Sequence, residues 1–208
     1  MEETVRKKLY CFDFDGTLTT SDTMLELIKF AHGKGGLLRG LLANAFWLVL
    51  MKLHFYPNWK SKEKVLTWFF GGMEVEDFKA ICQVFAMRCH TLIRPSAIAE
   101  ITGLMSKGDM VVVVSASADD WVRPMLEKVF PHVPALLSTR LEVVGDKISG
   151  RISGNNCHGQ EKVERIKQYL KANGISRNDC YIYAYGDSKG DKEMMEYADE
   201  SFYKPFRD

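Results

Sequence analysis

The sequence predicts an α/β fold: a doubly wound parallel sheet with a helical cap inserted after the first strand. Short apolar runs alternate with stretches of helical periodicity, which is typical of a parallel sheet with helical crossovers. About ninety residues of helical character separate the first two runs, far more than one crossover helix requires. At 208 residues, the chain is long enough for one such core and one insertion.

The apolar runs that are expected to form the parallel strands are residues 9–14, 110–114, 180–185 and 201–206. A further run, 141–144, is joined to 147–152 by Gly145-Asp146, a pair suited to a hairpin turn, and we interpret it as a small flap. Polar residues follow the first three runs. Because ligands bind beyond the carboxyl ends of strands in open parallel sheets, we expect these polar side chains to converge there.

Residues 19–105 are expected to form the helical cap, and residues 1–18 and 106–208 the core. No Pro/Gly/Ser-rich linker separates these parts, so the cap should pack on the core rather than hang from a tether.

Composition restricts the partners and the compartment. The 28 Lys and Arg residues balance 27 Asp and Glu residues, so no overall field attracts nucleic acid or anionic lipid, any charged partner must be recognised locally, and no nucleic-acid partner is expected. The five cysteines are scattered and form no C-x-x-C pair, which argues against a disulfide framework or a zinc site and favours a reducing compartment. The polar residues 1–8 lack the features of a signal peptide, so we expect a cytoplasmic location.

Two aspartates, Asp13 and Asp15, stand in an Asp-x-Asp pattern at the end of the first predicted strand. Side chains of an extended segment alternate in direction, so both carboxylates point to the same side. A hard divalent cation would relieve their repulsion, and Mg²⁺ is preferred to Ca²⁺ where a phosphate supplies further oxygens. Asp-Gly alone is also a common turn signal, so this interpretation depends on acidic residues elsewhere.

Residues 186–191 supply those acidic residues at a later strand end. Asp187 directly follows a β-prone run, which favours metal binding over helix capping. Asp191 opens the next predicted helix, where capping alone would explain it.

Phosphate-binding candidates lie on two further segments. Ser115 and Ser117 follow the second predicted strand, where hydroxyl and free backbone N–H groups suit a phosphate oxygen, although the same pattern is an N-cap signature. Lys162 opens another predicted helix, where an ammonium group could neutralise a phosphate. Most lysines are solvated, so this assignment needs independent support.

In this order, the four elements resemble the motifs of haloacid dehalogenase-like (HAD) phosphatases, which have a Rossmann-like core. Residues 13–19 resemble motif one, 114–117 motif two, Lys162 motif three and 186–191 motif four. The resemblance implies that Asp13 is a nucleophile that forms an aspartyl-phosphate and that Asp15 is the acid and base. It also implies Mg²⁺ bound by Asp13, the backbone carbonyl of Asp15 and Asp187, with Asp191 assisting from the same cluster. Ser115, Ala116 and Lys162 would hold the phosphate.

The cap and the segment Val-Ser-Ala-Ser-x-x-x-Trp resemble subfamily IB, the phosphoserine phosphatase branch. Members specific for phosphoserine carry a glutamate shortly after motif one, whereas the acidic residues here are Asp22 and Glu26, which argues against amino-acid specificity. Residues 158–162 and 187–189 and the apolar cap resemble the phosphatidylglycerophosphatase C group, which implies a lipid phosphate monoester such as phosphatidylglycerophosphate. A soluble metabolite phosphatase, acting on phosphoserine or a sugar phosphate, is the alternative.

A receiver-type signalling domain is an alternative of another class, because receivers also gather aspartates, Ser/Thr and Lys at the ends of parallel strands. Receivers lack a cap of this size, however, and their cores are close to one small doubly wound sheet.

The run 37–53 is almost wholly apolar but too short for a confident membrane span, which needs about twenty residues. One crossing would also put Asp13 and Asp187 on opposite sides of the membrane. Two interpretations remain: peripheral contact with the inner face of the cell membrane, or packing within the cap or a dimer. The lysines that follow it would meet anionic headgroups in the first case and form a solvated helix face in the second; they are Lys52, Lys60, Lys62 and Lys64. The oligomeric state is left open.

Overall fold

Within residues 6–207, the part of the chain that the computed structural model describes, a six-stranded sheet has the order β4-β3-β2-β1-β5-β6. Its parallel strands are β1 (Lys7–Phe12), β2 (Met110–Ala118), β3 (Ala135–Val144), β5 (Cys180–Gly186) and β6 (Glu200–Tyr203). The strand β4 (Lys147–Ser153) pairs antiparallel with β3. The predicted parallel α/β sheet is confirmed.

Helices cover both faces of the sheet because side chains of each central strand alternate between two apolar cores. On β1, Leu9 and Cys11 pack on the face covered by α7 (Gln160–Ala172) and α8 (Lys192–Tyr197). Tyr10 and Phe12 pack on the opposite face. That face is covered by α5 (Pro95–Ser106) and α6 (Asp119–Val129). The sheet is therefore doubly wound.

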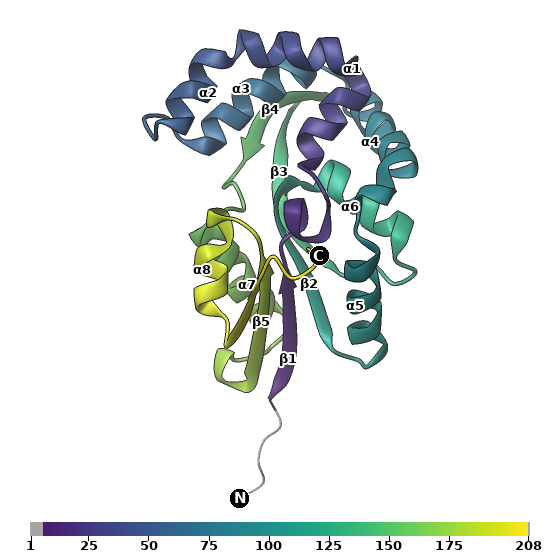
Figure 1. The fold of residues 1–208 in the computed structure, drawn as a ribbon, viewed down its shortest axis with the longest axis vertical. Helices are drawn as coiled ribbons and strands as arrows, with labels where there is room; N and C mark the ends of the chain where they lie inside the picture. Colours follow the sequence, from purple (N-terminus) through teal and green to yellow (C-terminus); the bar gives the residue numbers. More distant parts are fainter. Residues whose placement is uncertain (1–5, 208) are drawn as a thin grey trace, which may run out of the picture.

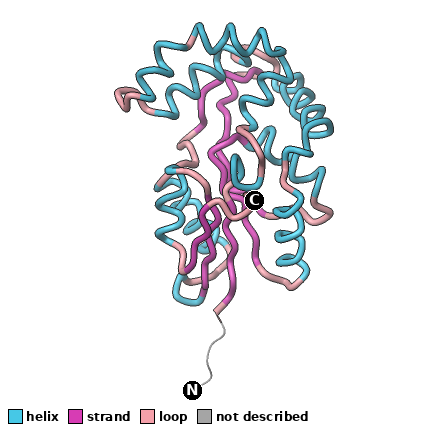
Figure 2. Tube along the Cα trace, viewed as in Figure 1, coloured by secondary structure: helices cyan, strands magenta, loops and turns pink. Residues whose placement is uncertain are grey.

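The segment between β1 and β2 forms a layer of helices beyond the carboxyl ends of the strands (Figure 1). These helices are α1 (Thr23–Ala43), α2 (Ala45–Lys52), α3 (Asn58–Phe70) and α4 (Val75–Cys89). Figure 2 shows that helices dominate this layer, whereas α5 runs back alongside the sheet. The helical insertion after the first strand is thus present, and the exact boundaries 19–105 stay a prediction.

The β3–β4 hairpin is longer than the predicted flap. Its turn includes Gly145, whose φ of 64° fits the expected hairpin. The expectation that the strand begins at 141 is wrong, because β3 begins at Ala135 and first pairs with β2 as a core strand. Its opening residues, Ala-Leu-Leu-Ser, lack β-branched side chains, which concealed the strand in the sequence.

The distal end of this hairpin packs against the cap, where β4 contacts α3. Gly150 has φ of 82°, and a Cβ there would lie 2.4 Å from the Cα of Thr67 on α3. Only glycine allows this close approach. The hairpin thus connects the core sheet with the cap.

The apolar run 37–53 is divided between two helices that meet at Asn44, whose side-chain Nδ2 donates a hydrogen bond to the Gly40 carbonyl at 2.9 Å. Among residues 6–207, no helix has the length and apolar character needed to cross a membrane.

Candidate active site

Three carboxylates from separate segments meet at the carboxyl ends of the central strands. Asp13 directly follows β1, Asp187 directly follows β5, and Asp191 lies in the turn before α8. Each offers one oxygen, and these oxygens lie within 4.8 Å of one another. Asp13 and Asp191 are buried, and Asp187 is half-buried. Oxygen ligands so close together can share one hard divalent cation.

Lys162 joins this cluster from the first turn of α7. Its side chain is almost fully buried, and its Nζ donates to Asp13 Oδ1 and Asp191 Oδ1 at 2.6 Å each and to the Val114 carbonyl at 2.8 Å. These three contacts use every proton of the ammonium group. Burial alone would lower the pKa of Lys162, but the two carboxylates outweigh burial and raise the pKa above its ordinary value. Lys162 is therefore cationic at any physiological pH.

One lysine does not fully offset the negative charge at Asp13. Burial raises the pKa of Asp13 to about 7, and the effect of Lys162, which lowers this pKa, is partly cancelled by the charge of Asp191. Thr17 Oγ1 donates to Asp13 Oδ2 at 3.1 Å. The ionised carboxylate thus gains from a further cation nearby.

Asp191 belongs to the charged cluster, but its side chain makes no capping hydrogen bond to α8, the helix that it opens; it closes a capping box with Ser188 in the short turn before that helix. Its Oδ2 accepts hydrogen bonds from the backbone N–H and hydroxyl of Ser188, at 3.0 and 2.8 Å, while its Oδ1 accepts from Lys162. Burial favours a raised pKa, but Lys162 and Ser188 outweigh it and lower the pKa of Asp191. Asp191 is therefore a fixed anion that orders the turn.

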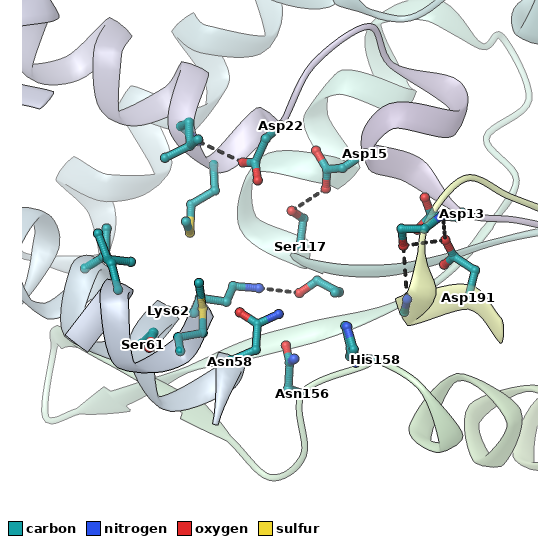
Figure 3. A pocket seen from close by; sticks show the side chains of 18 of the residues that line it. Asp13, Asp15, Asp22, Asn58, Ser61, Lys62, Ser117, Asn156, His158 and Asp191 are labelled. Carbon is teal, nitrogen blue, oxygen red and sulfur yellow. Dashed lines mark hydrogen bonds between the residues drawn. The ribbon is translucent and has the colours of Figure 1, made fainter. Parts of the chain in front are cut away.

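Asp15 lies in the turn after β1 and also lines the pocket. Its Oδ1 accepts from the backbone N–H and hydroxyl of Thr23 at 2.7 and 2.6 Å. Its Oδ2 accepts from Ser117 Oγ at 2.6 Å, as Figure 3 shows. Trp121 Nε1 donates to Thr23 Oγ1 at 3.1 Å. The first residue of α1 and the end of β2 thus fix the carboxylate of Asp15 together. The roles of Thr23 and Trp121 were not found in the sequence.

The strand β2 extends to Ala118, so Ser115 and Ala116 belong to its carboxyl end rather than following it, and the residues of this end differ in exposure. Ser115 is fully buried, and its Oγ accepts from the Ser117 backbone N–H at 3.0 Å. Ala116 and Ser117 line the pocket. The Ala116 carbonyl accepts a hydrogen bond from Lys62 Nζ at 2.5 Å.

These groups surround a cavity of about 330 Å³ between the core and the cap. Its floor contains Asp13, Asp15, Lys162 and Asp191. Its cap side is largely apolar, with Met24, Leu25, Leu41, Leu48, Met51 and Val65 beside the polar Asn58 and Ser61. The cavity therefore joins a charged end to an apolar end.

Two charged cap residues also line this cavity. In the sequence Lys62 looks like one of the surface lysines, but its side chain reaches into the pocket (Figure 3). Burial there lowers the pKa of Lys62 to about 8, although the charges of Asp15 and Asp22 raise it. Asp22 caps α1 by accepting from the Leu25 N–H at 3.0 Å, and burial, followed by the charge of Asp15, raises its pKa. Glu26 instead pairs with Lys29 on the same helix. Sequence periodicity could not show which lysine of α3 faces inward toward the core.

Asp187 has a partner that the sequence did not reveal. Arg207, after β6, forms an ion pair with Asp187 Oδ2 and donates to the Gly16 carbonyl at 3.2 Å. Burial raises the pKa of Asp187, and Arg207 opposes this effect. Gly16 has φ of 80°, and a Cβ there would lie 2.5 Å from Asp187 Oδ2. A glycine is therefore required for the first turn to approach Asp187.

The doubly wound core, helical cap and charged pocket define a phosphatase of α/β architecture. The chain belongs to the haloacid dehalogenase-like hydrolase family, whose model matches residues 11–196. Within this family it is phosphoserine phosphatase-like. The resemblance inferred from the four motifs is thus confirmed, and membership of a hydrolase family leaves the receiver alternative without support.

Two relatives match nearly the whole chain. Protein CicA of Caulobacter vibrioides is 34% identical over 210 residues, covering 96% of this chain and 86% of the relative. The phosphoserine phosphatase of Methanocaldococcus jannaschii is 28% identical over 196 residues, covering 93% of this chain and 83% of the relative.

Solved structures show the same fold. A protein of unknown function from Bordetella pertussis Tohama I matches with a TM-score of 0.82 at 20% identity, covering 95% of this chain and 90% of that one. A phospho-aspartyl intermediate analogue of phosphoserine phosphatase matches with a TM-score of 0.68 at 23% identity, covering 95% and 86%.

Proposed function

We propose that this protein is a Mg²⁺-dependent phosphomonoesterase that forms an aspartyl-phosphate on Asp13 and favours a lipid phosphate monoester such as phosphatidylglycerophosphate. The observation that carries this proposal is a single cavity with a carboxylate and lysine floor and an apolar cap wall. In this proposal, residues 1–18 and 106–208 carry out the chemistry, and the cap, 19–105, receives the rest of the substrate.

The donor set fits Mg²⁺. Carboxylate oxygens of Asp13, Asp187 and Asp191 lie within 4.8 Å of one another, and hard oxygen ligands are those that Mg²⁺ prefers. Asp13, Asp187 and the backbone carbonyl of Asp15 would hold the ion, with Asp191 assisting through Lys162. When bound, Mg²⁺ offsets the negative charge of the phosphate and the attacking carboxylate.

The residues of the chain then have complementary roles. A carboxylate oxygen of Asp13 attacks phosphorus, the bond from phosphorus to the ester oxygen breaks, and Asp15 donates a proton to that leaving oxygen. Asp15 next takes a proton from a water molecule, which attacks phosphorus and breaks the bond to Asp13, releasing phosphate. The three hydrogen bonds that Asp15 accepts from Thr23 and Ser117 support this role, because a proton-transfer group must keep a fixed position.

Phosphate binding is assigned to Ser115, Ala116 and Lys162. Lys162 contributes a permanent positive charge beside Asp13. The carboxyl end of β2, which contains Ser115 and Ala116, faces the same cavity through Ala116 and Ser117. This pairing of a lysine with a polar strand end suits a dianionic phosphate.

The cap wall supports an amphiphilic substrate. Lys62 donates one hydrogen bond, to a neutral carbonyl, so its charge remains available for a second anionic group such as the phosphodiester of phosphatidylglycerophosphate. Beyond Lys62, the apolar side chains of α1, α2 and α3 suit an acyl or glyceride portion.

Peripheral contact with a membrane through 37–53 belongs to this proposal. Two helices that line the cavity, α1 and α2, also expose large apolar side chains, namely Leu38, Leu42, Phe46 and Val49. Leu53 and Phe55, which follow α2, are exposed as well, Phe55 by 79%. Exposed apolar groups of this number are typical of an interaction surface. Lys60 and Lys64, which lie over Trp59 and Trp47, supply positive charge for anionic headgroups nearby.

Phosphoserine is the second candidate substrate. Asp22 and Lys62 both line the cavity, and this pair of opposite charges suits an ammonium and a carboxylate on one small molecule. The Methanocaldococcus jannaschii relative is a phosphoserine phosphatase.

A substrate panel tests the proposal. Phosphatidylglycerophosphate, phosphoserine, sugar phosphates and p-nitrophenyl phosphate are assayed with and without Mg²⁺, using Asp13→Asn as the inactive control. We expect Mg²⁺-dependent phosphate release that is highest for the lipid. Turnover by Asp13→Asn within about tenfold of wild type would refute the nucleophile assignment, and a preference for phosphoserine would replace the lipid with the second candidate.

A further inference from the structure

The segment that follows β6 returns to the carboxyl end of the sheet and is held there by several contacts (Figure 1). The Lys204 N–H donates to the Gly186 carbonyl at 2.8 Å, and Arg94 Nη1 donates to the Phe206 carbonyl at 3.4 Å. The ring of Phe206 stacks with those of Phe12 and Tyr185, with centroids 6.2 and 6.1 Å apart. The backbone that carries Arg207 is therefore anchored to the ends of β1 and β5.

From this position, the guanidinium of Arg207 bridges the two turns that form the proposed metal site. It pairs with Asp187 Oδ2 and donates to the Gly16 carbonyl at 3.2 Å. Gly16 belongs to the turn after β1, and Asp187 to the turn after β5. A planar guanidinium with several fixed donors can hold two such acceptors at once, which a lysine ammonium does less well.

Two opposite roles are conceivable for a cation at this place: it could occupy the ion's position, or it could orient a ligand from outside. A substitute for the ion would contact Asp13 together with Asp187. The oxygens of Asp13 instead accept from Lys162 and Thr17, and those of Asp191 accept from Lys162 and Ser188. Arg207 contacts Asp187 and Gly16, and 38% of its side chain is exposed. It therefore lies on the outer side of the carboxylate cluster.

We propose that Arg207 is a positioning residue for the metal: it holds Asp187 Oδ2 and the Gly16 carbonyl, so that Asp187 Oδ1 is left for the ion. This inference rests on the proposed function, because it requires a divalent cation at Asp13 and Asp187. Partners of this kind fix the orientation of a ligating carboxylate, and their loss typically weakens metal affinity by about 10- to 100-fold.

The direction in which Mg²⁺ affinity changes when Arg207 is removed separates this positioning role from a purely electrostatic effect. Removing a positive charge near a cation site strengthens cation binding when only long-range charge matters. Positioning predicts the reverse, a weaker affinity in Arg207→Ala. Lys204 provides the matched control, because its charge also lowers the pKa of Asp187, yet its ammonium lies over the Tyr203 ring.

The experiment is isothermal titration of MgCl₂ into the metal-free full chain, with circular dichroism to verify the fold of each variant. We expect Arg207→Ala to raise the Kd for Mg²⁺ by about 10- to 100-fold, Arg207→Lys to recover part of the loss, and Lys204→Ala to bind as tightly as wild type or slightly more tightly. In the p-nitrophenyl phosphate assay, the Mg²⁺ concentration for half-maximal rate should rise in Arg207→Ala, while kcat at saturating Mg²⁺ stays within about threefold.

The outcomes distinguish two failures. Unchanged or tighter Mg²⁺ binding by Arg207→Ala would overturn the positioning role while leaving the metal site intact. If wild type bound Mg²⁺ no better than Asp187→Asn, the metal site itself would fail, and this inference with it.

Discussion

Replacing Lys62 with methionine should separate substrates that carry a second anionic group from those that do not. Methionine keeps the length of the apolar stem and removes the charge. Hydrogen bonds to charged groups contribute about 1.5–3 kcal/mol, and about 1.4 kcal/mol corresponds to tenfold in rate. We therefore expect kcat/KM for a soluble short-chain phosphatidylglycerophosphate to fall by about 10- to 100-fold, and for p-nitrophenyl phosphate by less than about threefold.

The pH dependence gives a second signature of Lys62. Burial lowers its pKa to about 8, and a lysine is cationic below its pKa and neutral above it. In wild type, kcat/KM for the lipid should therefore decline as the pH rises through about 8, because this parameter reports groups of the free enzyme. The decline should be absent in Lys62→Met.

Lys64→Met is the matched control, because Lys64 lies on the same helix and is exposed. Its kinetics with the soluble substrate should equal those of wild type. The reasoning is refuted if Lys62→Met slows p-nitrophenyl phosphate as much as the lipid. That result would mean that Lys62 merely supports the end of β2 at Ala116, to whose carbonyl it donates.

Three further predictions concern Asp15, the metal and the cap. Thr23→Val removes one of the hydrogen bonds to Asp15 Oδ1 and should lower kcat by about 10- to 100-fold, whereas Thr23→Ser should retain activity; equal activity in Thr23→Val would contradict the fixed position of Asp15. Mg²⁺ affinity, measured by titration calorimetry, should fall as the pH drops below about 7, because burial raises the pKa of Asp13 to about 7 and protons then compete with the ion; a constant affinity between pH 5.5 and pH 8 would argue against Asp13 as a ligand. The double variant Leu42→Glu and Phe46→Glu, at positions that are 66% and 65% exposed, should lose flotation with vesicles containing phosphatidylglycerol but keep its activity on soluble substrates; wild-type protein that does not float would remove support for membrane contact.

Local patterns in the sequence were sufficient to predict the core of the site. The Asp-x-Asp pattern after an apolar run, and Asp187 after another, indicated convergence because parallel strands end at one edge of the sheet. The structure brings Asp13, Asp187 and Asp191 together with Lys162. The catalytic and ligand roles assigned to these residues stay predictions.

Residues contributed by other segments could not be predicted in the same way. Lys62 looks like its neighbours on α3 in the sequence, and only the packing of the cap on the core turns it toward Ala116. Arg207 is 20 positions from Asp187, and no motif connects the two residues. Thr23 begins an ordinary helix, and its contact with Asp15 depends on how the chain turns after β1.

The sequence by itself determined the helical insertion after the first strand, the carboxylates at the strand ends and every strand except the core part of β3, because these depend on local periodicity and short-range turn chemistry. Only the tertiary structure decided which side chains complete the pocket. Long-range packing of α1, α2 and α3 over the sheet forms the apolar wall and leaves other apolar side chains exposed. Such packing depends on contacts between distant segments, which hydrophobic periodicity along one segment does not specify.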